Sequence, residues 1–319
     1  MTTMQVFPAP GAITAALDRL PADGSPAVLQ LAPGVYREPV VIRRPHTALE
    51  GESPENTRIV WADGARDLLP DGTKRGTFRT ATVRVDGEAV TLRRLTVENG
   101  AGPREACGQA IALYADGDGF LCEDCVLLGW QDTLFTAPLP PKEIEPGGFV
   151  GPKQFAPRVP QRQRYLRCTI RGDVDFIFGS AAAWFEDCDI VTADGRQDRT
   201  APFTAWCTAA STPEGQAMGY VFYHCRFTAE PDVPAGSTWL GRPWREYAKT
   251  VLIDCDLGPH IHPAHWHDWG KEAFHHLGYY AATTPAAQAP SWAHVLTEAE
   301  RGLYTQENFM RLALSDTRR

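Results

Sequence analysis

The sequence lacks any long hydrophobic run. Nothing in its 319 residues approaches the roughly 18 uninterrupted apolar residues of a membrane-spanning helix. The amino terminus has no basic region followed by an apolar one, so no secretory signal is visible. An excess of positive charge is also missing, because 31 Lys and Arg face 39 Asp and Glu, for a formal net charge of −8. We therefore expect no membrane span and no nucleic-acid partner, which would call for a basic patch.

Six segments of the chain share one pattern. Each has an apolar or Cys residue three positions before a central residue and an apolar residue two positions after it. The central residues are Leu95, Cys125, Cys168, Cys188, Cys225 and Cys255. Each segment is a short β-branched or aromatic run closed by Gly, Pro, Asp or Asn, which is typical of a strand followed by a turn. Repetition of this kind indicates a solenoid or a propeller.

The spacing of the repeats favours a solenoid. Cys168 and Cys188 are 20 residues apart, enough for one coil of a parallel β-helix but too few for a four-stranded propeller blade. The interval from Cys125 to Cys168 is 43 residues and contains the Pro- and Gly-rich segment 136–161, which has no periodicity. We therefore predict an all-β parallel β-helix that forms a single domain over residues 1–319.

The positions of the cysteines give little support for disulfide bonds or for a metal site. Five of the eight cysteines occupy the same repeat position, which predicts a ladder of buried thiols along one inner face. Disulfides are less expected in a large chain without a visible signal. The only C-x-x-C, Cys122 and Cys125, has no second pair at ligand spacing. The group His262-x-x-His265-x-His267 could offer imidazoles to a metal, but ordinary histidines are commoner, so we expect no metal and no cofactor.

Both ends of the chain carry helical signals. The apolar residues between Ile13 and Leu20 have helical spacing and predict a helix that caps the open end of the solenoid. The repeat region is expected from about residue 77 to 259. Beyond it, the segment 291–314 contains Thr297-Glu298-Ala299-Glu300, a capping box, and predicts a C-terminal helical segment covering the side or far end.

Two aspartates share a register within the repeat. Asp132 and Asp175 each lie seven residues after a cysteine of the ladder. Neighbouring parallel strands lie about 4.8 Å apart, so these two side chains could be carboxylate neighbours on adjacent coils. Each could instead be a turn residue, since Asp is favoured after strands. A close pair would share one proton, which lets one carboxyl act as an acid while the other remains a base.

Four sequence blocks occur in the order found in a known enzyme family. They are Gly108-Gln-Ala-Ile-Ala-Leu113, Gly129-Trp-Gln-Asp-Thr-Leu134, Gly172-Asp-Val-Asp-Phe-Ile-Phe-Gly179 and Leu240-Gly-Arg-Pro-Trp244. With these blocks the sequence resembles the pectin methylesterase (pectinesterase) family, and its long segment 136–161 is similar to bacterial forms. The resemblance implies a right-handed parallel β-helix and a carboxylic ester hydrolase that removes methyl esters from galacturonate units.

The resemblance also implies roles for the residues that match. Asp175 would be the nucleophile, and Asp132 the acid that protonates departing methanol and then the base that activates water. Gln131 resembles the donor to the tetrahedral oxyanion, with Gln109 beside it. Two further matches concern the Leu240–Trp244 block: Arg242 resembles the residue that orients the nucleophile, and Trp244 the ring on which a sugar packs. Thr77 is similar to a substrate contact.

Plainer interpretations of these residues stay open at this point. Arg242 could be a surface ion pair, Trp244 a core aromatic, and Gln109 and Gln131 members of structural amide ladders. The segment 136–161 could restrict access to short chains if it folds over the cleft.

Other functions and settings are also open. A β-helical polysaccharide lyase or glycoside hydrolase would use acidic residues in a cleft, and a non-catalytic carbohydrate-binding β-helix could keep the groove without the chemistry. The expected partner is pectin or a methylated oligogalacturonide, bound by a monomer. Free thiols and the lack of a visible signal favour the cytoplasm, with secretion of a trimmed precursor as the alternative.

Overall fold

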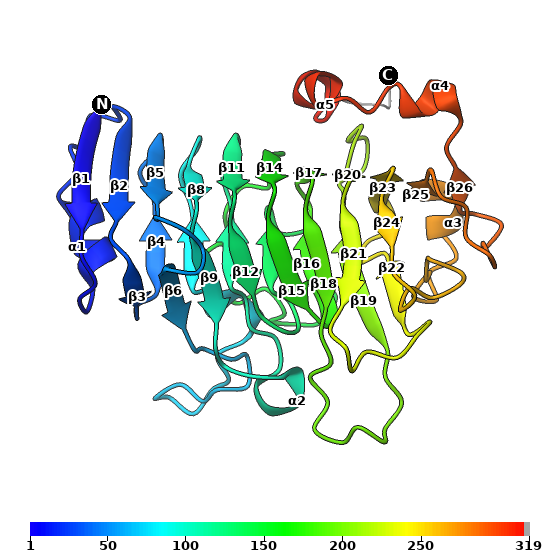
Figure 1. Cartoon of the computed structure of the whole chain (residues 1–319), viewed down its shortest axis with the longest axis horizontal. Helices are drawn as coiled ribbons and strands as arrows, with labels where there is room; N and C mark the ends of the chain where they lie inside the picture. The colour runs from blue at the N-terminus through cyan, green and yellow to red at the C-terminus, as the bar shows by residue number, and fades with distance from the viewer. Residues whose placement is uncertain (316–319) are drawn as a thin grey trace.

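Three parallel sheets run along the long axis of the molecule, which the computed structural model describes for residues 1–315 (Figure 1). Sheet A contains, in spatial order, β1 (Thr2–Val6), β2 (Ala27–Leu31), β5 (Thr47–Glu50), β8 (Thr91–Arg93), β11 (Phe120–Glu123), β14 (Arg162–Leu166), β17 (Ala182–Glu186), β20 (Tyr220–Tyr223), β23 (Lys249–Ile253), β25 (Tyr279–Ala282) and β26 (His294–Val295). Sheet B contains β3 (Gly34–Tyr36), β6 (Thr57–Trp61), β9 (Thr96–Asn99), β12 (Val126–Leu128), β15 (Thr169–Gly172), β18 (Asp189–Thr192), β21 (Arg226–Ala229) and β24 (Asp256–Leu257). Sheet C contains β4 (Val40–Ile42), β7 (Val83–Val85), β10 (Leu113–Ala115), β13 (Leu134–Thr136), β16 (Val174–Gly179), β19 (Ala205–Ala210) and β22 (Thr238–Gly241).

Each coil contributes one strand to each sheet. The strands β14, β15 and β16 form one coil, and β17, β18 and β19 form the next. Ile170 pairs with Ile190, so the register advances by the 20 residues that separate Cys168 from Cys188. The predicted right-handed parallel β-helix is confirmed. Its coils extend beyond the expected range of 77–259, because strands before residue 77 and after residue 259 join the same sheets without the cysteine pattern.

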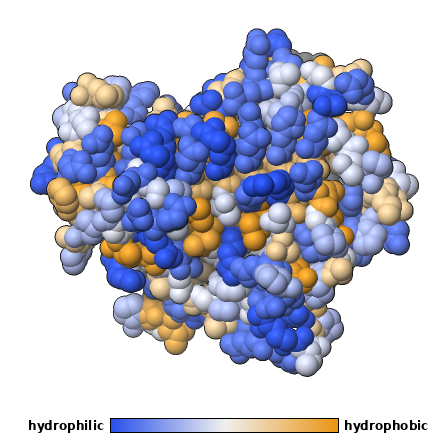
Figure 2. Space-filling view, viewed as in Figure 1, coloured by the Kyte–Doolittle hydropathy of each residue, from blue (hydrophilic) through white to orange (hydrophobic). Residues whose placement is uncertain are grey.

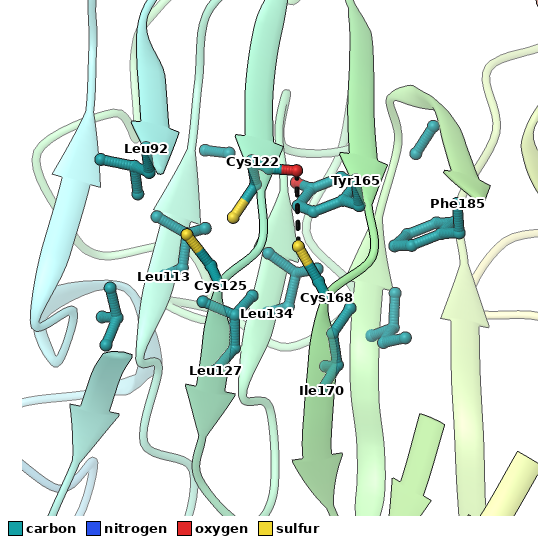
Figure 3. Packing of buried hydrophobic residues seen from close by; sticks show 14 of the residues in the cluster. Leu92, Leu113, Cys122, Cys125, Leu127, Leu134, Tyr165, Cys168, Ile170 and Phe185 are labelled. Atoms are coloured by element: carbon teal, nitrogen blue, oxygen red, sulfur yellow. Dashed lines mark hydrogen bonds between the residues drawn. The ribbon is translucent and has the colours of Figure 1, made fainter. Parts of the chain in front are cut away.

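The repeat position lies at a turn between sheet A and sheet B. The residue before each repeat position has a left-handed backbone, with φ from 48° to 53°. These residues are Arg94, Asp124, Arg167, Asp187, His224 and Asp254. The turn directs the following side chain into the core, and all eight cysteines are free and buried. The Sγ of Cys168 donates to the carbonyl of Cys122 at 3.4 Å, one coil earlier (Figure 3). The predicted ladder of buried thiols is confirmed.

Aromatic rings stack along the inner face of sheet A. The ring centroids of Tyr165 and Phe185 are 4.7 Å apart at 12° between planes, and those of Phe185 and Phe222 are 4.5 Å apart at 10°. These residues come from β14, β17 and β20, so the rings follow the coils. Phe185 lies in the middle of the stack and is fully buried.

We expect Phe185→Ala to lower the free energy of unfolding by about 3 to 5 kcal/mol, because a large buried side chain is replaced by a cavity between two rings. Equilibrium unfolding in urea measures this difference. Phe155→Ala is the matched control, since Phe155 is 91% exposed and its removal should change the unfolding free energy by less than about 0.5 kcal/mol. Equal effects of the two changes would contradict the account of the core.

Helix α1 (Ala12–Asp18) lies at the amino-terminal end of the solenoid, as predicted (Figure 1). It contacts β1, β2 and β4 and buries Ile13 and Ala16. The carboxylate of Glu38 accepts the backbone N–H groups of Ile13 and Thr14, at 2.9 and 3.1 Å. These donors have no partner within a helix, so the carboxylate stabilises the first turn.

The carboxyl-terminal segment differs from the prediction. Residues 291–314 form β26, α4 (Glu298–Arg301) and α5 (Gln306–Leu312), so the expected helical segment is two short helices after a strand. The capping box of Thr297 and Glu300 is confirmed. Phe309 of α5 packs on Trp184 of β17, at 5.6 Å between ring centroids, so this segment covers the side of sheet A. The remaining helices are η1 (Thr77–Arg79), α2 (Arg104–Cys107) and α3 (Phe274–Leu277).

Figure 2 shows hydrophilic residues gathered on the lobe at the lower right, where the segment 193–204 leaves the coils between β18 and β19. Within residues 1–315, no helix has the length and apolar character needed to cross a membrane.

Candidate active site

A cleft of about 610 Å³ is lined by all seven residues that the family resemblance singled out. These residues are Thr77, Gln109, Gln131, Asp132, Asp175, Arg242 and Trp244. They come from segments more than 160 residues apart in the chain, so the coiling of the chain brings them together. The segment 136–161 also reaches this cleft, through Ile144, Glu145, Gly148 and Phe149.

The two aspartates occupy equivalent places on adjacent coils. Leu134 of β13 pairs with Ile177 of β16, and each aspartate lies two residues before its member of that pair. The backbone N–H of Asp132 donates to the carbonyl of Val174 at 3.1 Å. Both side chains lie in the cleft and both residues are 7% exposed. The shared register inferred from the cysteine spacing is therefore confirmed.

Both aspartates also have a strained backbone. Asp132 has φ of 68° and Asp175 has φ of 49°, in the left-handed region that few non-glycine residues adopt. Strain of this kind persists where the surrounding structure holds it, and it is frequent at functional sites.

A β-bulge directs Asp175 into the cleft. Val174 pairs with Trp206 but Ile177 pairs with Thr208, so β16 has one more residue than β19 across this interval. A bulge re-aims side chains, and here Phe176 remains fully buried in the core while Asp175 lines the cleft. Gly172 permits the tight turn, since a Cβ there would lie 2.2 Å from the Cβ of Phe176.

Arg242 binds Asp175 in a bidentate arrangement. Its Nε lies 2.8 Å from Oδ1 and its Nη2 lies 2.7 Å from Oδ2. The guanidinium is held between two rings, 3.9 Å from the centroid of Trp206 and 3.7 Å from that of Trp269. The side chains of Arg242 and Asp175 are 13% and 10% exposed, so this pair is not a surface ion pair.

The environment separates the two carboxyl groups in proton affinity. Burial raises the pKa of Asp132 well above its ordinary value, and the charge of Asp175 raises it further. Burial also raises the pKa of Asp175, but the hydrogen bonds and charge of Arg242 oppose that shift. These effects favour the proton on Asp132 over a proton on Asp175.

The two glutamines lie on adjacent coils with their side chains free. The backbone N–H of Ala110 donates to the carbonyl of Gln131 at 3.1 Å, which joins the two blocks. Within residues 1–315 neither side-chain amide makes a hydrogen bond, and both line the cleft. The alternative of structural amide ladders is therefore wrong, and both amides are available to a ligand.

Trp244 and Thr77 line the cleft beside the segment 136–161. Trp244 is half-buried, with its ring centroid 5.7 Å from that of Phe178 and 6.1 Å from that of Phe149. Thr77 begins η1, next to Phe78, whose ring centroid lies 5.8 Å from that of Phe149. Through Phe149 the segment 136–161 therefore packs against Phe78 and against Trp244, which both line the cleft. Trp244 is therefore not a fully buried core aromatic, because it lines the cleft.

Several residues of the site were not singled out by the sequence. Trp206 and Trp269 hold Arg242, and Arg245 and Lys271 line the cleft. The Nζ of Lys271 donates to the carbonyl of Pro243 at 2.8 Å, and burial lowers the pKa of Lys271 to about 8. Among these residues only Trp269 carries a sequence signal, because the stretch Trp266-His267-Asp268-Trp269 resembles a segment near the cleft in the pectin methylesterase family.

The histidine group has other partners. The His262 ring stacks on Trp239 at 3.7 Å between centroids, and the Nδ1 of His267 accepts the backbone N–H of Trp269 at 2.9 Å. Among residues 1–315 no group of three or more His, Cys, Asp and Glu is placed to hold a metal ion.

Comparisons with known proteins identify one family. The family model for Pectinesterase matches residues 10–139 and 158–310, which leaves out 140–157 of the segment that reaches the cleft. The chain is 30% identical over 314 residues to the probable pectinesterase/pectinesterase inhibitor 23 of Arabidopsis thaliana, covering 94% of this chain and 50% of that protein. The chain spans about half the length, or less, of the curated relatives that it first matches.

Solved structures have the same fold. The pectin methylesterase PemA from Erwinia chrysanthemi is 26% identical, with a TM-score of 0.76 over 97% of both chains. A pectin methylesterase in complex with a hexasaccharide is 27% identical, with a TM-score of 0.75 over 93% of this chain and 92% of that one. Since the family model covers most of the sequence and the motif residues meet in one cleft, the chain belongs to the pectinesterase family.

Proposed function

We propose that this protein is a pectin methylesterase, which hydrolyses the methyl esters of galacturonate units in pectin or methylated oligogalacturonides and releases methanol. The observation that carries the proposal is the buried pair of Asp132 and Asp175, with Arg242 bound to one member only. The solved relative in complex with a hexasaccharide supports an oligosaccharide as the ligand of the cleft.

In the first half of the reaction, an ionised Oδ of Asp175 attacks the carbonyl carbon of the ester. A carboxylate with an ordinary pKa of about 4 is a weak nucleophile, so it depends on fixed placement and on stabilisation of the oxyanion. The strand and Arg242 supply the placement, and the free amide of Gln131 supplies a donor to the oxyanion. As the intermediate collapses, the bond to the methoxy oxygen breaks and Asp132 gives its proton to that oxygen, which leaves as methanol.

In the second half, Asp132 is a carboxylate and acts as a base. It takes a proton from a water molecule, whose oxygen attacks the carbonyl of the galacturonyl group on Asp175. The bond to Asp175 breaks, so the sugar leaves as a carboxylic acid and Asp175 is again ionised. One ester and one water have then become one acid and one methanol, and Asp132 again holds its proton. Trp244 offers a ring for sugar packing, with Gln109 and Thr77 as polar contacts at the wall of the cleft.

The products separate this proposal from the other candidates. Incubation with highly methylated pectin should release methanol and acidify the solution. A lyase would give an unsaturated sugar that absorbs in the ultraviolet, and a glycoside hydrolase would give new reducing ends. Binding of the polymer without any product would favour a carbohydrate-binding protein. Absence of methanol release from both polymer and short methylated oligomers would contradict the proposal.

We expect Gln131→Ala to lower kcat by roughly a hundredfold or more, because one donor to a developing oxyanion contributes about 3 to 4 kcal/mol to the barrier. KM should change little, since the donor acts mainly in the transition state. Initial rates of methanol release measure both constants. Gln30→Ala is the control, because Gln30 is exposed on β2 of sheet A and should have no effect. A loss below about threefold in Gln131→Ala would show that this amide is not the donor.

We also infer a single domain over residues 1–319, because the three sheets of the described residues 1–315 share one row of coils. We expect this domain to act as a monomer, because all seven candidate site residues come from one copy of the chain. Eight free, buried thiols favour a reducing compartment, so we place the enzyme in the cytoplasm, acting on imported oligogalacturonides. Light scattering tests the oligomeric state, and cell fractionation tests the compartment. Recovery of the protein from the culture medium would contradict the location.

A further inference from the structure

A third buried carboxyl group lies behind the Asp132 and Asp175 pair. Asp173 is 2% exposed and lies two residues before Asp175, but the reaction above does not use it. Burial of an ionisable group is costly unless it is paired. Its nearest cation within residues 1–315 is Arg104 of α2, with 3.7 Å between Nε and Oδ2, longer than a direct hydrogen bond. Asp173 is therefore a buried acid with a loosely held counter-ion.

The backbone of one residue, Val174, links Asp173 to Asp132. The Oδ1 of Asp173 accepts the backbone N–H of Val174 at 2.8 Å, and the carbonyl of Val174 accepts the backbone N–H of Asp132 at 3.1 Å. The backbone of Asp173 is fixed as well, since its N–H donates to the carbonyl of Trp130 and its carbonyl accepts from Trp206. A charge on Asp173 therefore has a fixed place, one hydrogen-bonded residue away from Asp132.

Other charged groups around Asp173 are few. Arg171 of β15 lies on the same side, but its Nε is bound to Glu230 at 2.6 Å. The thiol of Cys107, on α2, also lies within range of the charge on Asp173. Asp132 and Asp175 both line the cleft, and the cations of Arg242 and Lys271 act on Asp175. Arg104 is thus the cation that acts on Asp173 and on Asp175 alike.

The electrostatic effects of this pair have opposite signs. Burial raises the pKa of Asp173 to about 6, with the charge of Arg104 opposing the shift, so Asp173 is mostly ionised at neutral pH. Its negative charge contributes to the raised pKa of Asp132. For Asp175 the bidentate Arg242 is the main cation that favours the ionised form, followed by Lys271, and the positive charge of Arg104 acts in the same direction.

We propose that Asp173 and Arg104 are positioning residues of the esterase reaction, Asp173 by holding the proton on Asp132 and Arg104 by keeping Asp175 ionised. This inference rests on the proposed function, because it assigns the pair a task only where Asp132 is the acid and Asp175 the nucleophile. Neither residue lines the cleft, so neither is expected to contact the substrate.

The pH dependence of kcat/KM for methanol release tests the proposal. Activity should fall at low pH as Asp175 gains a proton and at high pH as Asp132 loses its proton. Asp173→Asn keeps the size and an acceptor for Val174 but removes the charge, so the alkaline limb should move down by about one pH unit. Arg104→Gln should move the acid limb up, while kcat/KM at the optimum stays within about tenfold in both variants.

Asp189→Asn is the matched control, because Asp189 forms an exposed pair with Arg226 at 2.7 Å on sheet B and should leave both limbs in place. A purely structural role for Asp173 would lower activity at every pH without moving either limb. Limbs that stay within about 0.2 pH units of wild type in both variants would overturn the proposal. Arg104→Gln carries the test alone if Asp173→Asn does not fold, since Arg104 is partly exposed.

A second readout does not depend on activity. The carboxyl carbon of Asp132, identified in ¹³C-aspartate-labelled protein by its loss in Asp132→Asn, should titrate at lower pH in Asp173→Asn than in wild type. If wild type releases no methanol but this shift is present, the proposed function fails while the electrostatic coupling stands. If wild type is active and the Asp132 carbon titrates identically in both proteins, the inference fails and the proposed function stands.

Discussion

Asp175→Asn is expected to lower kcat for methanol release by about 10⁴-fold or more. The neutral amide of Asn has almost the same shape as the carboxylate but cannot attack an ester carbonyl, so the covalent step is lost. Arg242 keeps a carbonyl acceptor, which limits the structural disturbance beside it. Comparison of initial rates for the two proteins on methylated pectin and on short methylated oligomers measures the effect.

The control for this change is Asp256→Asn, because Asp256 is exposed on β24 of sheet B, and it should retain full activity. Circular dichroism spectra and thermal unfolding of Asp175→Asn should match those of wild type, which separates lost chemistry from lost folding. Turnover near the wild-type rate, in a preparation verified free of contaminating esterase, would remove Asp175 from the role of nucleophile.

Asp132→Asn is expected to lower kcat on the methyl ester by about 10²- to 10⁴-fold, because methoxide is a poor leaving group without a proton from a general acid. An ester of a more acidic alcohol, such as trifluoroethanol, needs that proton far less. The first half of the reaction should therefore remain fast with such an ester in Asp132→Asn, and remain absent in Asp175→Asn. The two variants thus separate the acid from the nucleophile.

The second half of the reaction gives a further distinction. Asp132→Asn also lacks the base that activates water, so the trifluoroethyl ester should give a rapid burst of about one alcohol per enzyme, followed by slow turnover. Stopped-flow or quenched-flow detection of the alcohol measures the burst. Equal losses of rate on the methyl and trifluoroethyl esters, with no burst, would show that Asp132 does not serve as acid and base.

The register of the reacting pair could be predicted from the sequence, and the reason is physical. The interior of a β-helix repeats with each coil, so the buried thiols of Cys125 and Cys168 mark equivalent places along the chain. Counting seven residues from each cysteine then reaches Asp132 and Asp175, because no insertion falls between ladder and cleft in either coil. The expected roles of these residues were inferred from the long motifs that contain them, because a long motif defines both the residue types and their spacing.

Features that depend on long-range packing could not be predicted from the sequence. The bulge at Asp175 is visible only when β16 is aligned against β19, and the residue type alone does not tell which aspartates adopt a left-handed φ. Trp206 lies on a strand between two motifs, and its contact with Arg242 arises from the stacking of coils. The segment 136–161 could be recognised as an excursion, but its path depends on the packing of Phe149 against Phe78 and Trp244.

The carboxyl-terminal segment shows the limit of local signals. The capping box at Thr297 predicts the start of a helix correctly, and Gly302 at the C-cap is a local signal for its end. The place of the next helix has no such signal, since Phe309 of α5 packs on Trp184 on the side of sheet A. Local signals mark where such a helix begins and ends, and tertiary contacts determine where it lies.

The most direct test of the central claim is intact-protein and peptide mass spectrometry of Asp132→Asn mixed with the trifluoroethyl ester of a short oligogalacturonide and quenched after the burst. We predict an added galacturonyl group on the peptide that contains Asp175, and none in the double variant that also carries Asp175→Asn. An adduct on a different residue, or hydrolysis of the ester by Asp132→Asn with no adduct at any time, would contradict a covalent role for Asp175.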